Sequence, residues 1–447
     1  MTPSRSNRSI IFIALTVALA LFGVSGAGLA AQTEQVSRYT LENGMTVVSR
    51  VGGNAGGLSS ACLFVRVGSA YEDPEKSGVT NLLNHMALAC QPSGGAVPPA
   101  LKIEQLGGKV WVETSFEYTC FKLAAPSKNF PQALKALAEA VSAPACSDAA
   151  LAVERDALAS GEGGQYDDRL VEKAYREFLK KRFGDSGYGL YPDGDESALE
   201  SITGTDARGW HVRRYQPEAM LLSVYGPSEE GQLKKAVNES FGRMASGVCS
   251  SGRPALGARG QSSCGRTDLP APKGGAAAVI GYASAPPGAA DYPAMLVAGA
   301  IVSDGMASKM FRGLREDNDL AYSFGGLTSC SAGGPHMAFY VCSDEGRVEP
   351  AVDCVRRSVN AVKSGDITAD EFARAKGTLI GELSFMREGA VGQAFSAGYY
   401  EFMGLGFDYP ATLAREVARL GKSDVVGAAS RRLDTGSLVV LKAKEAH

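Results

Sequence analysis

One segment of the chain is more informative than any other, and it reads Gly78-Val79-Thr80-Asn81-Leu82-Leu83-Asn84-His85-Met86-Ala87-Leu88. Its apolar side chains recur at helical spacing and form one stripe. Asn81, Asn84 and His85 are three and four residues apart, so they share the opposite face of that helix. A helix face in water normally carries long charged side chains. Two amides and an imidazole among apolar neighbours predict a half-enclosed pocket instead, and the alternative is a polar face satisfied by local hydrogen bonds.

The composition is that of an ordinary folded protein. The chain has 447 residues, of which 45% are hydrophobic and 21% charged, so it can build two packed domains. With 45 basic and 48 acidic side chains, its formal net charge of −3 excludes a chain-wide basic surface for nucleic acid. The nine cysteines are odd in number, so at least one thiol stays free or pairs outside the chain.

The first 31 residues predict export. Arg5 and Arg8 precede the run Ile10–Val24, which contains nothing more polar than Thr16, and small residues around Gly28 follow. A charged start, a short apolar core and a small-residue exit are typical of a secretory signal peptide. An uncleaved membrane anchor is the alternative, although the run is shorter than the ~20 residues that span a bilayer. We expect a periplasmic or extracellular protein.

The mature chain divides into two halves with the same order of elements. Residues 246–273 are rich in Gly, Ser, Pro and Arg and predict a linker between residues 36–245 and residues 274–447. Strands and helices are mixed in each half without a strict βαβ alternation. We therefore predict two tandem homologous α+β domains, each a mostly antiparallel sheet with helices packed on one face. Cys249 and Cys264 lie in the linker, where a disulfide and two free thiols are both open.

The helix at residues 78–88 resembles the zinc helix of the pitrilysin, insulysin and mitochondrial processing peptidase family. The motif of that family is His-x-x-Glu-His, in which two histidines bind zinc and the glutamate activates water. The corresponding residues here are Asn81, Asn84 and His85, so only the second histidine is kept. The flanking residues 77–80 and 86–87 match well.

The resemblance extends along the mature chain. Residues 153–158 match the helix that supplies the third zinc ligand, and residues 106–114 match the edge strand beside the cleft, except that Trp111 and Val112 replace the usual Asn-Ala. In the second half, residues 314–316 and 320–323 match a distinctive block of the family. We expect a helix at residues 306–315 and a strand that begins at Leu320. The resemblance implies that the chain is half of a clamshell.

The departures from the motif imply that this chain binds no zinc and does not hydrolyse peptides alone. Such a site needs three protein ligands and a water. Asparagine is a poor zinc ligand, and Asn84 cannot accept a proton from the water as a glutamate does. The third-ligand position falls on Gly161 by alignment of its helix, or on Glu162 by the spacing from His85. Even with Glu162, the vestigial site has two ligands.

Arg315 and Tyr322 are the family's substrate-facing pair in the half without zinc. In the family an arginine and a tyrosine at these positions reach towards the bound peptide, where they can clamp a carbonyl and stabilise an oxyanion. The alternative is an ion pair of Arg315 with Glu316 beside a half-buried aromatic ring.

These features predict an exported, non-catalytic subunit of a two-chain peptidase. It would contribute Arg315 and Tyr322 to peptide binding, while a homologous partner supplies the zinc and the glutamate. We expect extended or unfolded peptides as ligands, and no cofactor in this chain. The alternatives are a structural scaffold like the core subunits of respiratory complex III, peptide capture without cleavage, and, least favoured, an active zinc peptidase.

Overall fold

The computed structural model describes residues 35–52, 57–91, 97–160, 166–227, 229–247, 265–271, 275–433 and 436–442. The predicted signal peptide lies outside these residues, as do Gly161, Glu162, Cys249 and Cys264. Within the described residues, no helix is both long and apolar enough to cross a membrane.

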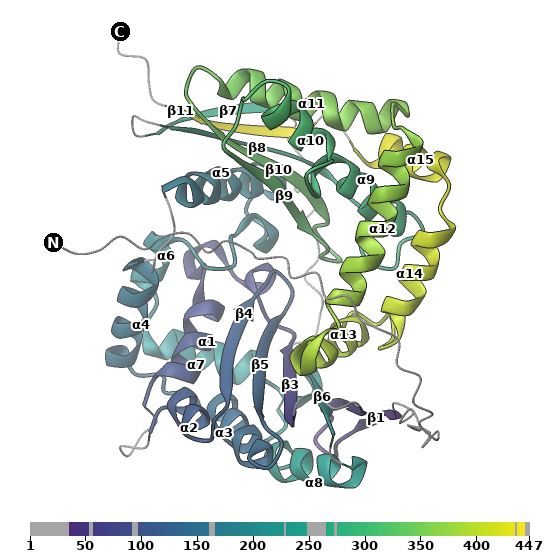
Figure 1. Cartoon of the computed structure of the whole chain (residues 1–447). Helices are drawn as coiled ribbons and strands as arrows, with labels where there is room; N and C mark the ends of the chain where they lie inside the picture. Colours follow the sequence, from purple (N-terminus) through teal and green to yellow (C-terminus); the bar gives the residue numbers. More distant parts are fainter. Residues whose placement is uncertain are drawn as a thin grey trace, which may run out of the picture. The chain divides into compact units, whose positions relative to one another are not determined.

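The first half of the chain builds a six-stranded sheet (Figure 1). Its strands are β1 (Gln35–Thr40), β2 (Thr46–Val51), β3 (Leu58–Val65), β4 (Lys109–Thr114), β5 (Thr119–Pro126) and β6 (Met220–Gly226). The order across the sheet is β1-β2-β6-β3-β5-β4, and β2 and β6 form its parallel pair. Strand β4, which pairs with β5, lies at one edge.

The second half repeats this layout in a five-stranded sheet. Its strands are β7 (Gly265–Pro270), β8 (Ala276–Ala283), β9 (Ser323–Ser329), β10 (His336–Ser343) and β11 (Ser437–Lys442), in the order β7-β11-β8-β10-β9. The last strand of each half lies between a parallel and an antiparallel neighbour. Strand β6 is parallel to β2 and antiparallel to β3, and β11 is parallel to β7 and antiparallel to β8. The prediction of two mostly antiparallel sheets with helices is confirmed.

Strand β7 falls inside the segment that the sequence indicated as a linker. Exposed and half-buried residues alternate along most of this strand, which lies at the edge of the sheet. It contains Arg266, Asp268 and Pro270. A charged edge strand of this kind lacks the apolar alternation by which strands are recognised. The second sheet therefore begins at Gly265, before the predicted domain start.

One face of each sheet is covered by helices of its own half. On the first sheet these are α1 (Val79–Ala89), α2 (Pro99–Gln105), α3 (Phe130–Ser142), α4 (Asp148–Ser160), α6 (Glu196–Ser201), α7 (Gly204–Arg214) and α8 (Glu230–Phe241). On the second they are α9 (Tyr292–Ser303), α10 (Lys309–Phe311), α11 (Val348–Ser364), α12 (Ala369–Phe385), α14 (Tyr409–Arg419) and α15 (Lys422–Arg432). Short turns lie at η1 (Ser69–Tyr71), η2 (Pro74–Lys76), η3 (Gly187–Gly189), η4 (Pro217–Ala219) and η5 (Arg312–Glu316).

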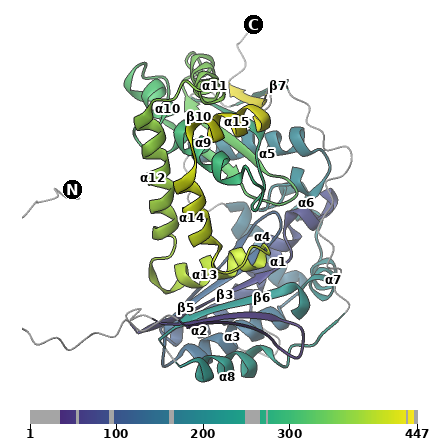
Figure 2. The ribbon, with the colours of Figure 1, turned by 90° about the vertical axis from the view of Figure 1, so that its right-hand side faces the viewer.

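The opposite face of each sheet is covered by a helix from the other half. Helix α5 (Tyr166–Phe183) of the first half packs on the second sheet, where Phe178 and Leu179 join Val279 and Val439 in one buried cluster. Helix α13 (Gly389–Phe402) of the second half packs on the first sheet. Figure 2 shows α12 and α14 side by side, running from the second sheet towards α13.

A glycine allows the close approach of helix and sheet in each of these two contacts, α5 on the second sheet and α13 on the first. A Cβ atom at Gly281 of β8 would lie 2.3 Å from the Phe178 ring, and one at Gly398 of α13 would lie 2.5 Å from the Phe64 ring and 2.7 Å from Ser223 Cβ. These glycines are therefore fixed by the packing of the two halves.

We expect Gly398→Ala to lower the free energy of unfolding by about 1–3 kcal/mol, because the added methyl group overpacks a closed contact. Gly377→Ala in α12 is the matched control, since a Cβ there meets nothing within 4 Å. It should be neutral or stabilising by up to about 1 kcal/mol. Urea unfolding measures both, and equal effects would contradict the packing argument.

Two buried polar groups also join the halves. Glu117, 8% exposed, accepts hydrogen bonds from Tyr188 Oη (2.6 Å) and from the backbone N–H of Gly333 (2.8 Å) and Ala332 (3.0 Å). His336 of β10 is 1% exposed, and its Nδ1 is 2.9 Å from the Gly334 carbonyl oxygen. A carbonyl only accepts, so Nδ1 carries the proton and Nε2 accepts from Tyr175 of α5 at 2.6 Å.

Burial lowers the pKa of His336 to about 4, below its ordinary value of 6.5. The unfolded chain therefore binds the proton first as the pH falls. The free energy of unfolding should therefore fall by about 3 kcal/mol as the pH is lowered from 6.5 to 4. In urea unfolding, His336→Leu should be less stable than the wild type at pH 7, with the gap narrowing by that amount at pH 4. A gap independent of pH would refute this assignment.

Candidate functional site

Helix α1 begins at a tight junction. Gly78, which precedes it, has φ +90°, and a Cβ there would lie 2.7 Å from Gly194 Cα and 2.8 Å from a methyl group of Leu199. Only glycine takes this conformation and allows this approach without strain. The loop at Gly194 is thereby held against the first turn of α1.

A buried carboxylate binds the N-terminus of α1. Glu72, 5% exposed, accepts from the backbone N–H of Gly78 at 2.7 Å through Oε2 and of Thr80 at 2.8 Å through Oε1. Burial raises the pKa of Glu72 to about 7, against the hydrogen bonds from Thr80 and Gly78 that lower it. The partial positive charge of a helix N-terminus favours a carboxylate at this point. Glu72 lies just before α1 in the sequence, and the intervening turn η2 folds its side chain back onto the start of the helix; no pattern in the sequence indicates this contact.

Asn84 is fully buried and fully hydrogen-bonded. Its Nδ2 donates to Thr114 Oγ1 of β4 at 2.9 Å and to Thr119 Oγ1 of β5 at 3.0 Å, while its Oδ1 accepts from Tyr215 Oη at 2.5 Å. Both amide protons and the amide oxygen are therefore engaged by the surrounding elements. For Asn84 the structure supports local hydrogen bonding, the alternative to a pocket-lining role.

The other two residues of the motif lie closer to the surface or to other charges. Asn81 is 5% exposed and His85 is half-buried. Burial raises the pKa of Asp193, and both Arg176 and His85 lie close enough to oppose that rise. His85 therefore lies near Asp193, whereas Asn84 bonds to strands of the sheet.

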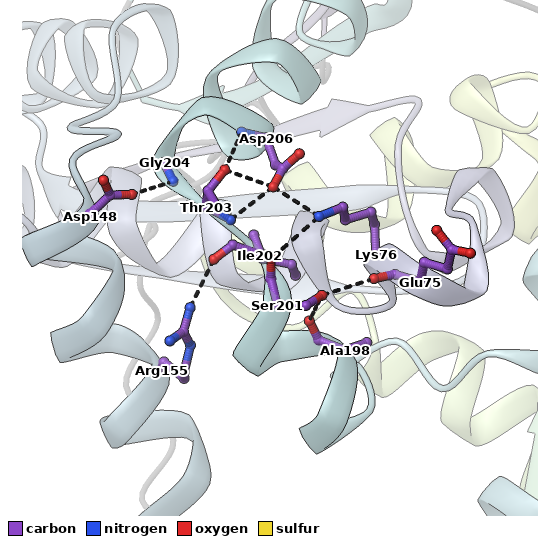
Figure 3. A network of polar contacts seen from close by, with 10 residues as sticks. All are labelled: Glu75, Lys76, Asp148, Arg155, Ala198, Ser201, Ile202, Thr203, Gly204 and Asp206. Carbon is purple, nitrogen blue, oxygen red and sulfur yellow. Dashed lines mark hydrogen bonds and ion pairs between the residues drawn. The ribbon is translucent and has the colours of Figure 1, made fainter.

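A network of polar contacts fixes the helices around α1 (Figure 3). Lys76 Nζ, in the turn before α1, lies 2.9 Å from Asp206 Oδ2, and Thr203 and Asp206 form a capping box at the start of α7. Arg155 of α4 donates to the Ile202 carbonyl oxygen at 2.8 Å, and Asp148 accepts from the Gly204 N–H at 2.7 Å. The hydrogen bonds from Lys76 and Thr203 lower the pKa of Asp206 to about 2.

A cavity of about 600 Å³ opens between α4, α5 and the Asp193 loop. Its lining contains six acidic side chains and two arginines, which are Arg155, Asp156, Glu172, Arg176, Asp193, Asp195, Glu196 and Glu200. Arg176 Nη2 is 2.6 Å from Glu172 Oε1, and its Nη1 is 3.5 Å from Asp195 Oδ1. Acidic side chains therefore predominate in the lining of this cavity.

Strand β4 bears the departures Trp111 and Val112, both half-buried. Lys109 Nζ lies 5.8 Å from the centre of the Trp111 ring. Because β4 is the last strand of its sheet, its outer edge offers backbone groups to which an extended peptide could pair.

Arg315 and Tyr322 flank an irregular segment of the second half. Arg315 is exposed in the π-helical turn η5, and Tyr322, 46% exposed, precedes the edge strand β9. Between them, Asp319 has φ +47°, and Arg347 Nη1 donates to its carbonyl oxygen at 2.7 Å. The predicted helix at residues 306–315 is thus two short turns, and β9 begins at Ser323 rather than Leu320.

The fold is a tandem pair of related α+β domains, and comparisons with known proteins identify the class of proteins that share it. The model of insulinase, peptidase family M16, matches residues 54–185, and the model of the peptidase M16 inactive domain matches residues 201–379. The chain belongs to this family, the pitrilysin-type peptidases.

Relatives span most of the chain. An uncharacterised zinc protease of Mycobacterium leprae is 27% identical, with 79% of each chain covered. One of Bacillus subtilis is 22% identical over 79% of this chain and 85% of its own. The crystal structures of a protease from Helicobacter pylori (TM-score 0.83) and of a peptidase M16 inactive domain from Pseudomonas fluorescens (TM-score 0.79) share the fold; each is 19% identical and covers 92% of this chain and 99% of its own.

The residues described here do not fit the zinc ion of the family. Asn84, which the sequence aligns with the family's glutamate, is a neutral amide whose hydrogen bonds go to Thr114, Thr119 and Tyr215. Among the residues that the structure describes, no three His, Cys, Asp or Glu side chains form a group that could hold a metal ion. The described residues of this chain therefore supply no metal-dependent catalytic step.

We expect Asn84→Ala to lower the free energy of unfolding by about 2–4 kcal/mol, because it leaves the buried hydroxyl groups of Thr119 and Tyr215 and the half-buried one of Thr114 without their amide partner. Tyr215→Phe removes a single hydrogen bond and should cost about 1–2 kcal/mol. Chemical unfolding of both variants and of the control Asn81→Ala tests this role. An Asn84→Ala protein as stable as the wild type would exclude it.

Proposed function

We propose that this chain is an exported, non-catalytic subunit of a pitrilysin-type peptidase, which binds peptides together with a homologous zinc-bearing partner. The observation that carries the proposal is the hydrogen bonding of Asn84 at the position of the catalytic glutamate. A neutral amide engaged in three hydrogen bonds cannot take a proton from water. Hydrolysis therefore has to come from another chain.

The same structure retains surfaces suited to a peptide. The edge of β4 can pair with an extended backbone. Arg315 and Tyr322 reach the surface from η5 and from the residue before β9. An arginine and a tyrosine there could hold the carbonyl groups of a peptide that the partner's zinc site cleaves.

The test uses the mature chain, alone and with a homologue that has an intact His-x-x-Glu-His motif and is encoded beside it. A quenched fluorescent peptide should be cleaved by the pair and not by this chain, and a chelator should abolish the cleavage. Chelator-sensitive turnover by this chain alone would overturn the proposal. An associated but inactive pair would favour the scaffold function.

Within an active pair, Arg315→Ala or Tyr322→Phe should lower kcat/KM by about 100- to 1,000-fold, the range found when a transition-state hydrogen-bond donor is removed. Arg312→Ala is the matched control, because Arg312 is an exposed arginine of the same turn. It should leave turnover within about twofold of the wild type. Equal losses from Arg312→Ala and Arg315→Ala would remove the basis for a specific role.

A further inference from the structure

A second cavity, of about 430 Å³, lies on the far side of β5 from α1 and has no part in the peptidase proposal. It is enclosed by the turn between β4 and β5, the end of β9, and helices α9, α12 and α13. Ligand sites are typically concave, mostly apolar and of about 300–1,000 Å³, with a few polar groups. This cavity fits that description.

Aromatic rings form much of its wall. The Tyr399 ring stacks on Phe395 at 5.7 Å and meets Tyr118 edge-on at 5.7 Å and Tyr400 at 5.1 Å. Tyr292 of α9 lies on another side. Leucine and methionine side chains complete the lining, and Met386 is 39% exposed. Aromatic side chains from α9, α13 and the turn between β4 and β5 therefore contribute to the lining.

The lining carries negative charge and no basic residue. Glu117 is its one ionisable carboxyl group, and no lysine or arginine is among the residues that line it. Lys122 Nζ lies 4.3 Å from the centre of the Phe395 ring but is paired with Glu113 at 2.5 Å. Tyr292 Oη donates to Cys330 Sγ at 3.5 Å, and sulfur is a weak acceptor.

We propose that this cavity binds a small organic cation, an ammonium group carried on an apolar body. Aromatic faces attract a cation most strongly when both are desolvated, and the Glu117 carboxylate adds a favourable charge. That carboxylate would repel an anion, and a neutral molecule would be stabilised only by contact with the apolar wall. The proposal is independent of peptide cleavage, because the cavity lies within one chain.

Calorimetric titration of the mature protein tests the proposal with three probes of similar size: benzyltrimethylammonium, 3-phenylpropan-1-ol and phenylacetate. The cation should bind about tenfold more tightly than the alcohol, which corresponds to about 1.4 kcal/mol, and phenylacetate should bind least. Equal affinities for the cation and the alcohol, or no saturable binding of the cation, would overturn the proposal.

Variants locate the binding. Leu296→Trp places a larger side chain in the cavity wall and should abolish binding of the cation, whereas Leu101→Trp, on the exposed side of α2, should not change it. Glu117→Gln should reduce the preference for the cation over the alcohol, provided that thermal unfolding shows it to be folded. Unchanged binding of the cation by folded Leu296→Trp would place the ligand elsewhere and refute the assignment.

Discussion

The structure depends on the reciprocal packing of α5 and α13. Each sheet has two apolar faces, and the helices of its own half cover only one of them. The second face is buried by a single helix from the other half, with Phe178 against β8 and Gly398 against β3 and β6. Neither half can move away without exposing an apolar sheet face, so the described residues after Glu34 behave as one compact unit.

This exchange also positions the candidate site. The chain leaves α5 through η3 and returns to α1 at Gly194, where two glycines meet. The acidic cavity beside Asp193 is formed by α4, α5 and this loop. Its geometry is therefore set partly by the second sheet, on which α5 is anchored through the Tyr175–His336 hydrogen bond.

Asn84, which the sequence aligns with the glutamate of the family's zinc motif, has a structural role in this fold. The hydroxyl groups of Thr114, Thr119 and Tyr215 surround Asn84 as a complementary set of acceptors and a donor. The cost of burying an amide is offset only when such partners are present. Asn84 thus makes a polar core contact between α1, β4 and β5. His85, which lies near Asp193, does not belong to that contact.

The sequence by itself determined the duplicated α+β architecture and the family, because these follow from local patterns and residue identities. Only the tertiary structure decided how the halves interlock and what Asn84 does. Tyr215 reaches Asn84 of α1 from a distant segment, and β7 pairs with a strand at the other end of its half. Such long-range pairings leave no periodic signal along the chain, since they depend on which surfaces meet after folding.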